Sequence, residues 1–232
     1  FCLACELRFL FTMLSEAKGR NCQATNFLRA FRHLPEAAAL GVLDNSTSGP
    51  SVAMGWMRKM GSLVRFVLSQ LNKELGGQQR AVEDIFGTQF GVEQTCLRCK
   101  ATVSSDKQSF VLDLLEPEPS VPATTRADAF AGLVERNLNK ETTSRAYCDD
   151  CRQFVPTKST SKVQNLPNVL AVTYSFPEEQ MVPFDFSKVP PKDTVDKDAL
   201  FAGFPIDTWL PWTFETEGIV YELQAVIQYV RD

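Results

Sequence analysis

Apolar side chains recur at helical spacing in the first third of the chain. Leucines at intervals of four, three and four residues predict a first helix with one apolar face. These leucines are Leu3, Leu7, Leu10 and Leu14. A short second helix is expected to start at Thr25 or Asn26, since both residue types cap helix N-termini, and to end before Pro35.

A third helix is expected from about Met57 to Leu75, because the apolar positions keep one face and Gly76 and Gly77 supply a stop. A loop rich in glycine, serine and proline precedes it over residues 44–51. Residues 124–138 show a further helical pattern.

After Phe86 the pattern changes toward a period of two residues, which is typical of strands. Alternation over residues 110–115 predicts one strand, and the apolar run of residues 169–174 predicts another. The last strand is expected over residues 221–229, where odd-numbered apolar side chains share one face. Between these strands, residues 177–211 are rich in proline, aspartate and lysine, which predicts an irregular insertion.

The order of these elements defines a fold class. Helices that come first and mixed β-structure that follows are typical of an α+β domain. We therefore predict a helical part over residues 1–86 and a β-rich part over residues 87–232.

Two Cys-x-x-Cys pairs have the spacing of metal ligands. Cys96 and Cys99 form one pair, Cys148 and Cys151 form the other, and 48 residues lie between the pairs. A two-residue gap lets both sulfurs of a pair reach one ion, and four thiolates complete a tetrahedral zinc site with no position left for water. The predicted role is structural, with the pairs on two hairpins that the fold brings together. Four unrelated reduced cysteines or a regulatory disulfide are the alternatives.

A third pair, Cys2 and Cys5, falls in the first predicted helix, where positions i and i+3 share a face. The remaining thiol, Cys22, is the one cysteine that could join them as a ligand. Packing of Cys2 and Cys5 in the apolar core is the expected arrangement.

The overall composition is that of a globular protein, with 44% hydrophobic and 22% charged residues. The net charge of -4, without a long basic run, argues against nucleic-acid contacts by this chain. No apolar stretch approaches the roughly 20 residues that span a bilayer. Seven cysteines, an odd number, favour reduced thiols in a cytosolic or nuclear setting. Phe1 in place of an initiator Met indicates a segment of a longer protein.

No catalytic set can be recognised in the sequence. The single histidine, His33, follows the second predicted helix, and Cys22 is the cysteine nearest to it in sequence, so a Cys–His dyad would require these two to meet in space. A structural role for His33 is the expected one. The acidic residues fall in loops or on polar helix faces, so a carboxylate site for a metal-dependent nuclease is not expected.

Six segments resemble motifs of the ubiquitin-specific protease family, in the order in which that family has them. The long helix resembles the family's EFLxxLLDxLxxEL helix, the two cysteine pairs resemble its zinc knuckles, and the last strand resembles its YxLxAVv strand. The segments are residues 66–75, 85–99, 109–114, 147–151, 166–170 and 221–226. The resemblance covers nearly the whole chain and implies a papain-like fold with a helical thumb, a β palm and fingers that carry a zinc ribbon.

The catalytic set of that family has no counterpart here. Its nucleophile box precedes the helical region, and no residue before Phe1 is present to supply it. Residues 60–63 read Met-Gly-Ser-Leu where the family usually has Gln-x-Asp-Ala, and Tyr229 stands where a histidine often follows. The resemblance therefore implies a member without catalytic function, and we assign no catalytic or cofactor-binding residue.

A narrower family resemblance lies at the start of the chain. Residues 1–14, 22–31 and 35–41 resemble the central domain of the catalytic subunits of poly(A)-specific ribonuclease (PAN) deadenylase complexes. This resemblance implies an inactive ubiquitin-hydrolase relative in a protein whose separate nuclease domain degrades mRNA poly(A) tails with a divalent metal such as Mg. The implied partners are that nuclease domain and a pseudokinase regulatory subunit, with poly(A) reached through the complex rather than through this domain. A cytoplasmic location, including P-bodies, is expected, without membrane contact.

The leading hypothesis is therefore a non-catalytic scaffold domain. Two alternatives remain open from the sequence. One is an active ubiquitin-specific protease whose Cys and His boxes lie outside this segment, and the other is a ubiquitin-binding module that has lost hydrolysis.

Overall fold

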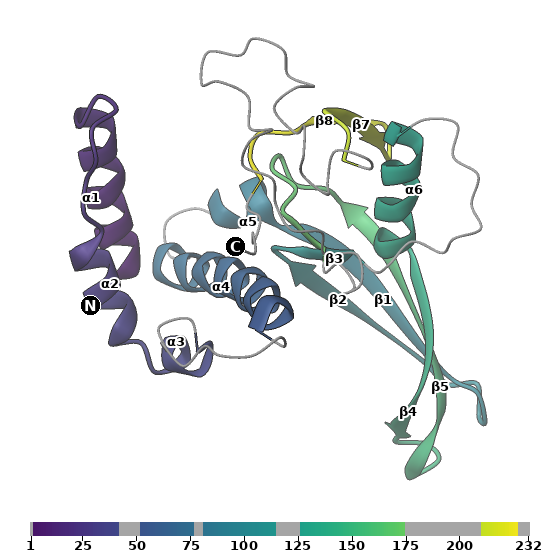
Figure 1. Cartoon of the computed structure of the whole chain (residues 1–232). Coiled ribbons are helices and arrows are strands. Elements are labelled where there is room, and N and C mark those ends of the chain that lie inside the picture. The colour runs from purple at the N-terminus through teal and green to yellow at the C-terminus, as the bar shows by residue number, and fades with distance from the viewer. Residues whose placement is uncertain (1, 42–51, 77–80, 115–125, 175–209, 227–232) are drawn as a thin grey trace. The chain divides into compact units, whose positions relative to one another are not determined.

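The computed structural model of the chain divides into two compact units (Figure 1). The described residues are 2–41, 52–76, 81–114, 126–174 and 210–226. The first unit consists of Phe1–Thr88, Gln108–Val111 and Asn165–Ala171, and the second of Gln89–Lys107, Leu112–Gln164 and Val172–Asp232. The predicted loop at 44–51 and nearly all of the predicted insertion at 177–211 lie outside the described residues.

The first unit is helical. Its helices are α1 (Leu3–Glu16), α2 (Thr25–Arg32), α3 (Pro35–Ala39), α4 (Val52–Leu75) and α5 (Ala81–Phe86). The apolar stripe of α1 buries its first two turns, since Leu3 is 1% exposed and Leu7 packs against it, whereas Leu14 remains 47% exposed. Phe31 of α2 completes this core and meets Phe66 of α4 edge to face, with ring centroids 5.7 Å apart.

Two helix boundaries differ from those predicted. Ala24 is the N-cap of α2 and makes no side-chain capping bond, so Thr25 is already helical. The third predicted helix, α4, begins at Val52, five residues earlier than Met57, and ends at Leu75 as expected. Gly76 follows it where a Cβ atom would approach the carbonyl oxygen of Asn72 to 2.7 Å, which explains the glycine.

The second unit holds most of a four-stranded sheet, in the order β2-β1-β5-β4. Its strands are β1 (Thr88–Cys96), β2 (Thr102–Ser109), β4 (Lys140–Cys148) and β5 (Gln153–Asn165). The two edge strands β2 and β4 have no buried side chain. Figure 1 shows the four strands running side by side into a long extension.

Two short pairs of strands and one helix complete this unit. Strand β3 (Leu112–Leu114) pairs in parallel with β6 (Val172–Tyr174), and β7 (Thr213–Thr216) pairs antiparallel with β8 (Ile219–Glu222). Helix α6 (Arg126–Leu138) covers β7, and its Phe130 meets Phe214 edge to face at 4.8 Å. The fold is thus α+β, as the order of elements predicted.

The last predicted strand is shorter than residues 221–229. Glu217 and Gly218 both have left-handed φ angles, 47° and 74°, which form a two-residue hairpin turn between β7 and β8. The ladder ends at Thr213↔Glu222, and beyond it the N–H of Leu223 still donates to the carbonyl oxygen of Trp212 at 2.8 Å, while residues 224–226 are not in a strand despite their alternation. Residues 227–229 lie outside the described part.

The predicted strand over residues 169–174 is likewise reduced to β6. Strand β3 offers only three residues for pairing, and these meet Val172 to Tyr174. Val169 instead donates its N–H to the carbonyl oxygen of Ile85 at 2.8 Å. None of the described helices combines the length and apolar character required to cross a membrane.

Candidate metal centre

The two cysteine pairs lie on two hairpins at one end of the four-stranded sheet. Cys96 ends β1 and Cys99 follows in the turn to β2, while Cys148 ends β4 and Cys151 follows in the turn to β5. The N–H of Leu97 donates to the carbonyl oxygen of Pro156 at 3.0 Å and ties the first hairpin to β5. The two pairs thus lie on two hairpins that a backbone hydrogen bond joins, as predicted.

The two turns have similar local features. Lys100 and Arg152, each directly after the second cysteine of a pair, have left-handed φ angles of 66° and 50°. This conformation costs roughly 1 kcal/mol for a residue with a Cβ, so the geometry of each turn must compensate for the unfavourable backbone conformation of Lys100 or Arg152. In the first turn the N–H of Cys99 points to the sulfur of Cys96, at 3.5 Å. The backbone therefore presents an N–H donor to a thiolate, as a metal knuckle requires.

The four sulfur atoms form one compact cluster. All Sγ atoms of Cys96, Cys99, Cys148 and Cys151 lie within 4.8 Å of one another. The closest sulfurs across the hairpins are 3.6 Å apart, between Cys99 and Cys148, and 3.9 Å apart, between Cys96 and Cys151. A tetrahedral ion with metal–sulfur bonds of about 2.3 Å places its sulfurs about 3.8 Å apart. The donor set therefore fits a tetrahedral ion that prefers thiolates.

The thiols differ in their pKa values. The N–H of Cys99 is the main cause that lowers the pKa of Cys96 to about 6, and the N–H of Arg98 adds to it. Burial is the main cause that raises the pKa of Cys151 to about 12, and the neighbouring thiols raise it further. The thiolate of Cys96 thus forms readily, whereas Cys151 needs a neighbouring cation to lose its proton.

Four protein ligands would fill every position around such an ion. A closed site cannot bind and activate water, so its contribution is to join the two hairpins. Cys96 is buried, Cys148 and Cys151 are half-buried and Cys99 is exposed, so the cluster lies near the surface. That these cysteines are metal ligands stays a prediction; the clustering of their sulfurs is observed.

The third cysteine pair lies elsewhere, and its predicted burial is wrong. Cys2 and Cys5 are both exposed, because Leu3 and Leu7 take the buried face of α1. Cys2 is the N-cap of α1: its sulfur accepts the N–H of Cys5 at 3.3 Å and its S–H donates to Glu74 at 3.6 Å.

His33 and Cys22 lie on either side of α2. His33 is the exposed C-cap of α2, and its N–H donates to the carbonyl oxygens of Ala30 and Phe31. Cys22 is half-buried in the segment between α1 and α2.

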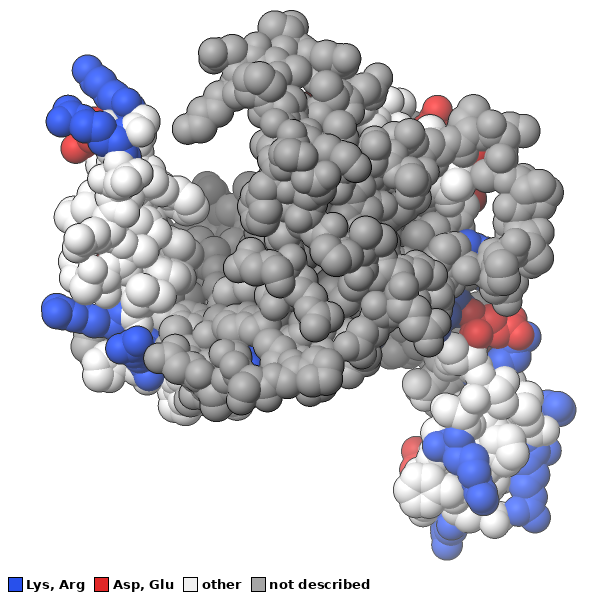
Figure 2. All heavy atoms as spheres, in the orientation of Figure 1, with Lys and Arg blue, Asp and Glu red and all other residues white. Residues whose placement is uncertain are grey.

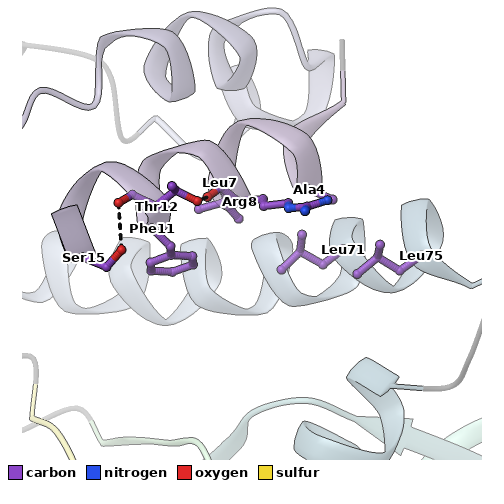
Figure 3. A pocket seen from close by; sticks show the side chains of 8 residues that line it. All are labelled: Ala4, Leu7, Arg8, Phe11, Thr12, Ser15, Leu71 and Leu75. Carbon is purple, nitrogen blue, oxygen red and sulfur yellow. Dashed lines mark hydrogen bonds between the residues drawn. The ribbon is translucent and has the colours of Figure 1, made fainter.

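A groove of about 630 Å3 lies between α1 and α4 (Figure 3). Its lining residues are Ala4, Leu7, Arg8, Phe11, Thr12, Ser15, Leu71 and Leu75. The hydroxyl of Thr12 donates to the carbonyl oxygen of Arg8 and that of Ser15 to the carbonyl oxygen of Thr12, so both are engaged with their own helix. The lining holds no carboxylate, histidine or cysteine, so it lacks the groups of a hydrolytic site.

The whole chain matches a known family. Residues 1–232 match the family model described as ubiquitin carboxyl-terminal hydrolase, so the chain belongs to the ubiquitin carboxyl-terminal hydrolase family. This agrees with the resemblance that the ordered motifs indicated.

One group of relatives within this family stands out. The catalytic subunit PAN2 of the PAN2-PAN3 deadenylation complex of Cryptococcus neoformans is 28% identical over 269 residues, which cover 100% of this chain and 22% of that protein. The chain therefore spans about a fifth of the length of this curated relative.

Solved structures of the same group share the fold. The Pan2 catalytic unit of Neurospora crassa, with protease and nuclease domains, superposes with a TM-score of 0.55 at 21% identity, over 97% of this chain and 36% of that one. The PAN2 pseudoubiquitin-hydrolase of Saccharomyces cerevisiae gives a TM-score of 0.55 at 20% identity, over 78% of this chain and 43% of that one. The fold is thus that of the ubiquitin-hydrolase-like module of Pan2 proteins.

Proposed function

We propose that this chain is a non-catalytic, ubiquitin-hydrolase-like scaffold domain of a poly(A)-specific 3'-exoribonuclease that acts in mRNA deadenylation. The observation that carries the proposal is the match of the entire chain to a PAN2 catalytic subunit. The fold shared with a protein described as a pseudoubiquitin-hydrolase supports the absence of protease activity. A poly(A) exonuclease site, with its divalent metal such as Mg, would then belong to another domain of the same protein.

The domain would work by binding proteins. Its partners in this proposal are the nuclease domain of the same protein and a pseudokinase regulatory subunit, as in a complex of the PAN2-PAN3 kind. In this proposal the complex acts on mRNA in the cytoplasm, including P-bodies.

We further propose that the ion held by the four clustered cysteines is zinc, in a structural role. Four thiolates in two Cys-x-x-Cys pairs are a donor set that structural zinc sites use, and zinc accepts the tetrahedral arrangement without a preference from d-electrons. Elemental analysis of the purified chain should give close to one zinc per molecule. An intact fold without bound metal would refute this assignment.

Two activity assays test the scaffold proposal. The purified chain should neither cleave a fluorogenic ubiquitin substrate nor shorten a poly(A) oligonucleotide. In the full-length protein, replacing this segment by a flexible linker should leave the nuclease folded but weaken deadenylation by the assembled complex.

The principal alternative is an active ubiquitin-specific protease whose catalytic boxes lie in other segments of the protein, which the family membership keeps open. Turnover of the ubiquitin substrate by the full-length protein would favour that alternative. Binding of free ubiquitin without turnover would favour a ubiquitin-binding module.

A further inference from the structure

Two exposed aromatic rings lie beside the cysteine cluster, on the hairpin formed by β4 and β5. Tyr147 is 55% exposed and Phe154 is 64% exposed, and the two residues lie directly opposite each other in the ladder. Their ring centroids are 5.6 Å apart and their planes meet at 71°. Rings at this angle do not cover each other, so flat ring surfaces remain available to a third planar group.

This face of the hairpin is directed to solvent. Arg145 and Pro156 are paired in the ladder, two positions along from the pair of Tyr147 and Phe154. Because side chains alternate along a strand, all four lie on the same face, and Arg145 and Pro156 are also exposed. The opposite face of β5 is the buried one, since Val155 is only 4% exposed. The aromatic pair is therefore not part of the core of the unit.

Arg145 places a cation next to the two rings. Its Nη2 atom donates to the carbonyl oxygen of Phe154 at 3.3 Å, across the two strands. A guanidinium has five N–H donors in a planar fork, so this bond leaves others for a phosphate oxygen.

The surrounding charge differs in sign from that of the whole chain. Residues 88–109 and 140–165, which form the four-stranded sheet and its turns, contain eight Lys and Arg against five Asp and Glu, whereas the chain carries -4. Within the second unit, Figure 2 shows several Lys and Arg side chains where Figure 1 draws the turn between β4 and β5. The net charge of the chain therefore does not describe this surface.

An exposed aromatic pair with an adjoining arginine is the combination that binds single-stranded nucleic acid. Bases stack on aromatic rings, and Lys or Arg contact the backbone phosphates. Aromatic residues and arginine are also enriched in protein interfaces. The remaining N–H donors of Arg145 and the uncovered ring surfaces favour an anionic chain with planar groups over a protein.

We propose that the outward face of the β4–β5 hairpin, formed by Arg145, Tyr147, Phe154 and Pro156, is a binding site for single-stranded RNA. One base stacks on the aromatic pair and Arg145 contacts a neighbouring phosphate. Arg98, Lys100 and Arg152 belong to the turns that hold the cysteines and offset the negative charge of four thiolates. Binding therefore depends on stacking more than on phosphates.

The test is a fluorescence anisotropy titration of a labelled oligoadenylate with the metal-loaded 232-residue chain. The double variant Tyr147→Ala/Phe154→Ala should bind about fivefold or more weakly, which is the lower end of the loss for one stacked base. Phe154→Trp should retain affinity, and Phe154→Leu should lose it despite its similar apolar character. With one or two phosphates contacted, the logarithm of the affinity should fall against the logarithm of salt concentration with a slope of about -0.7 to -1.4.

Phe9→Ala is the matched control, since Phe9 is 53% exposed but lies on α1, in the other unit. It should leave the affinity unchanged, and every variant should keep the wild-type metal content as a check of the hairpins. Absence of binding by the wild-type chain, or equal binding by the double variant, would overturn the proposal. Loss of a protein partner by the double variant with unchanged oligoadenylate affinity would also overturn it and assign the face to a protein. These results do not depend on the scaffold role, which the deadenylation assay of the assembled complex tests separately.

Discussion

Cys99 is the most accessible residue of the cysteine cluster, and its replacement tests the cluster most directly. Cys99→Ser removes one of four thiolates and leaves the closed site with a poor ligand, so affinity for zinc should fall by about tenfold or more. Zinc retention after dialysis against a weak chelator measures the change. Cys22→Ser, a change at a half-buried cysteine outside the cluster, should retain zinc like the wild-type chain. Equal retention by both variants would contradict the four-thiolate site.

Two glycines of the chain should respond in opposite directions to alanine. A Cβ on Gly87 would overlap the carbonyl oxygen of Glu83 and the amide of Gln108, so Gly87→Ala should reduce the free energy of unfolding by about 1–3 kcal/mol. Gly132 lies inside α6 with no atom within 4 Å of such a Cβ, so Gly132→Ala should increase it by about 0.5–1 kcal/mol. Chemical denaturation of both variants measures the two effects. The same sign for both would contradict the packing described around Gly87.

The spacing of the cysteines predicted the two sulfur pairs, because a Cys-x-x-Cys turn is a local feature of the sequence, and the expectation that one ion takes four thiolates predicted that the two pairs meet. The exposure of Cys2 and Cys5 was not predictable in the same way. Their helical spacing shows that they share a face, but which face is buried depends on the packing of Leu3 against Phe31, a contact between distant residues. The aromatic pair of Tyr147 and Phe154 also escaped notice, since only the strand register brings the two rings together.

At the scale of elements, a side chain from another helix adds to the N-terminal cap that Cys2 gives α1. Glu74, near the end of α4, accepts the N–H of Ala4 at 2.8 Å, and Gln70 orients it by donating to its other oxygen at 2.8 Å. The carboxylate thereby accepts a hydrogen bond from the N–H of Ala4, which has no acceptor within its own helix, and its negative charge lies at the positive end of the helix dipole. This cap joins two helices that are about seventy positions apart in sequence.

Glu74→Ala should reduce the free energy of unfolding by about 1 kcal/mol, the usual cost of a lost N-cap. Glu16→Gln, at the other end of α1, is the control and should not destabilise the chain, because a negative charge at the C-terminal end of a helix interacts unfavourably with the helix dipole. Thermal or urea unfolding at neutral pH measures the difference. A loss as large in the control would show that the cap contributes nothing specific.

The same cap predicts a pH dependence. Burial alone would raise the pKa of Glu74, but hydrogen bonds from the N–H of Ala4 and from Gln70 outweigh it, and the pKa is lowered. A lowered pKa means that the carboxylate stabilises the folded state above its unfolded pKa of about 4.3, and that this stabilisation is lost as the pH falls through the folded pKa. When the pH is lowered from neutral to below the folded pKa of Glu74, the free energy of unfolding should therefore fall less for Glu74→Gln than for the wild-type chain. Parallel unfolding curves for the two proteins would contradict this.

Strongly periodic helices were the most predictable elements. The apolar periodicity of α1 and α4 is visible in their own sequences. Strands β2 and β4 have polar sequences without alternation, and they form strands because β1 and β5 pair with them. The lengths of β6 and β8 were overestimated for a related reason, since β6 begins opposite the first residue of β3 and β8 ends opposite the first residue of β7. Pairing partners are a property of the fold that no local window contains.

At the scale of the whole molecule, the two units differ in how they are stabilised. The helical unit has a core of buried side chains around Leu3, Phe31 and Ala37. The far end of the four-stranded sheet is bordered by edge strands without buried side chains, so we expect metal binding to supply much of its stability.

Removal of the metal should therefore affect the units unequally. After treatment with a strong chelator, hydrogen exchange should accelerate by about tenfold or more in the β1–β2 and β4–β5 turns, while α1, α2 and α4 keep their protection. Exchange measured by mass spectrometry resolves these segments. A uniform loss of protection in both units would show that the metal stabilises the entire chain, and no loss would show that the sheet does not depend on it.

The separation of the two cysteine pairs also governs how the chain reaches its fold. Cys99 and Cys148 are 49 positions apart, and Asp113 and Thr173, paired in the parallel strands, are 60 apart. Contacts of this range form late because the intervening chain must first be ordered. An ion captured by one turn would give the second hairpin a strong docking point and shorten that search. In a chain synthesised where zinc is scarce, the unpaired backbone groups of the edge strands β2 and β4 would stay exposed for longer. The supply of metal during synthesis would then determine what fraction of the protein aggregates.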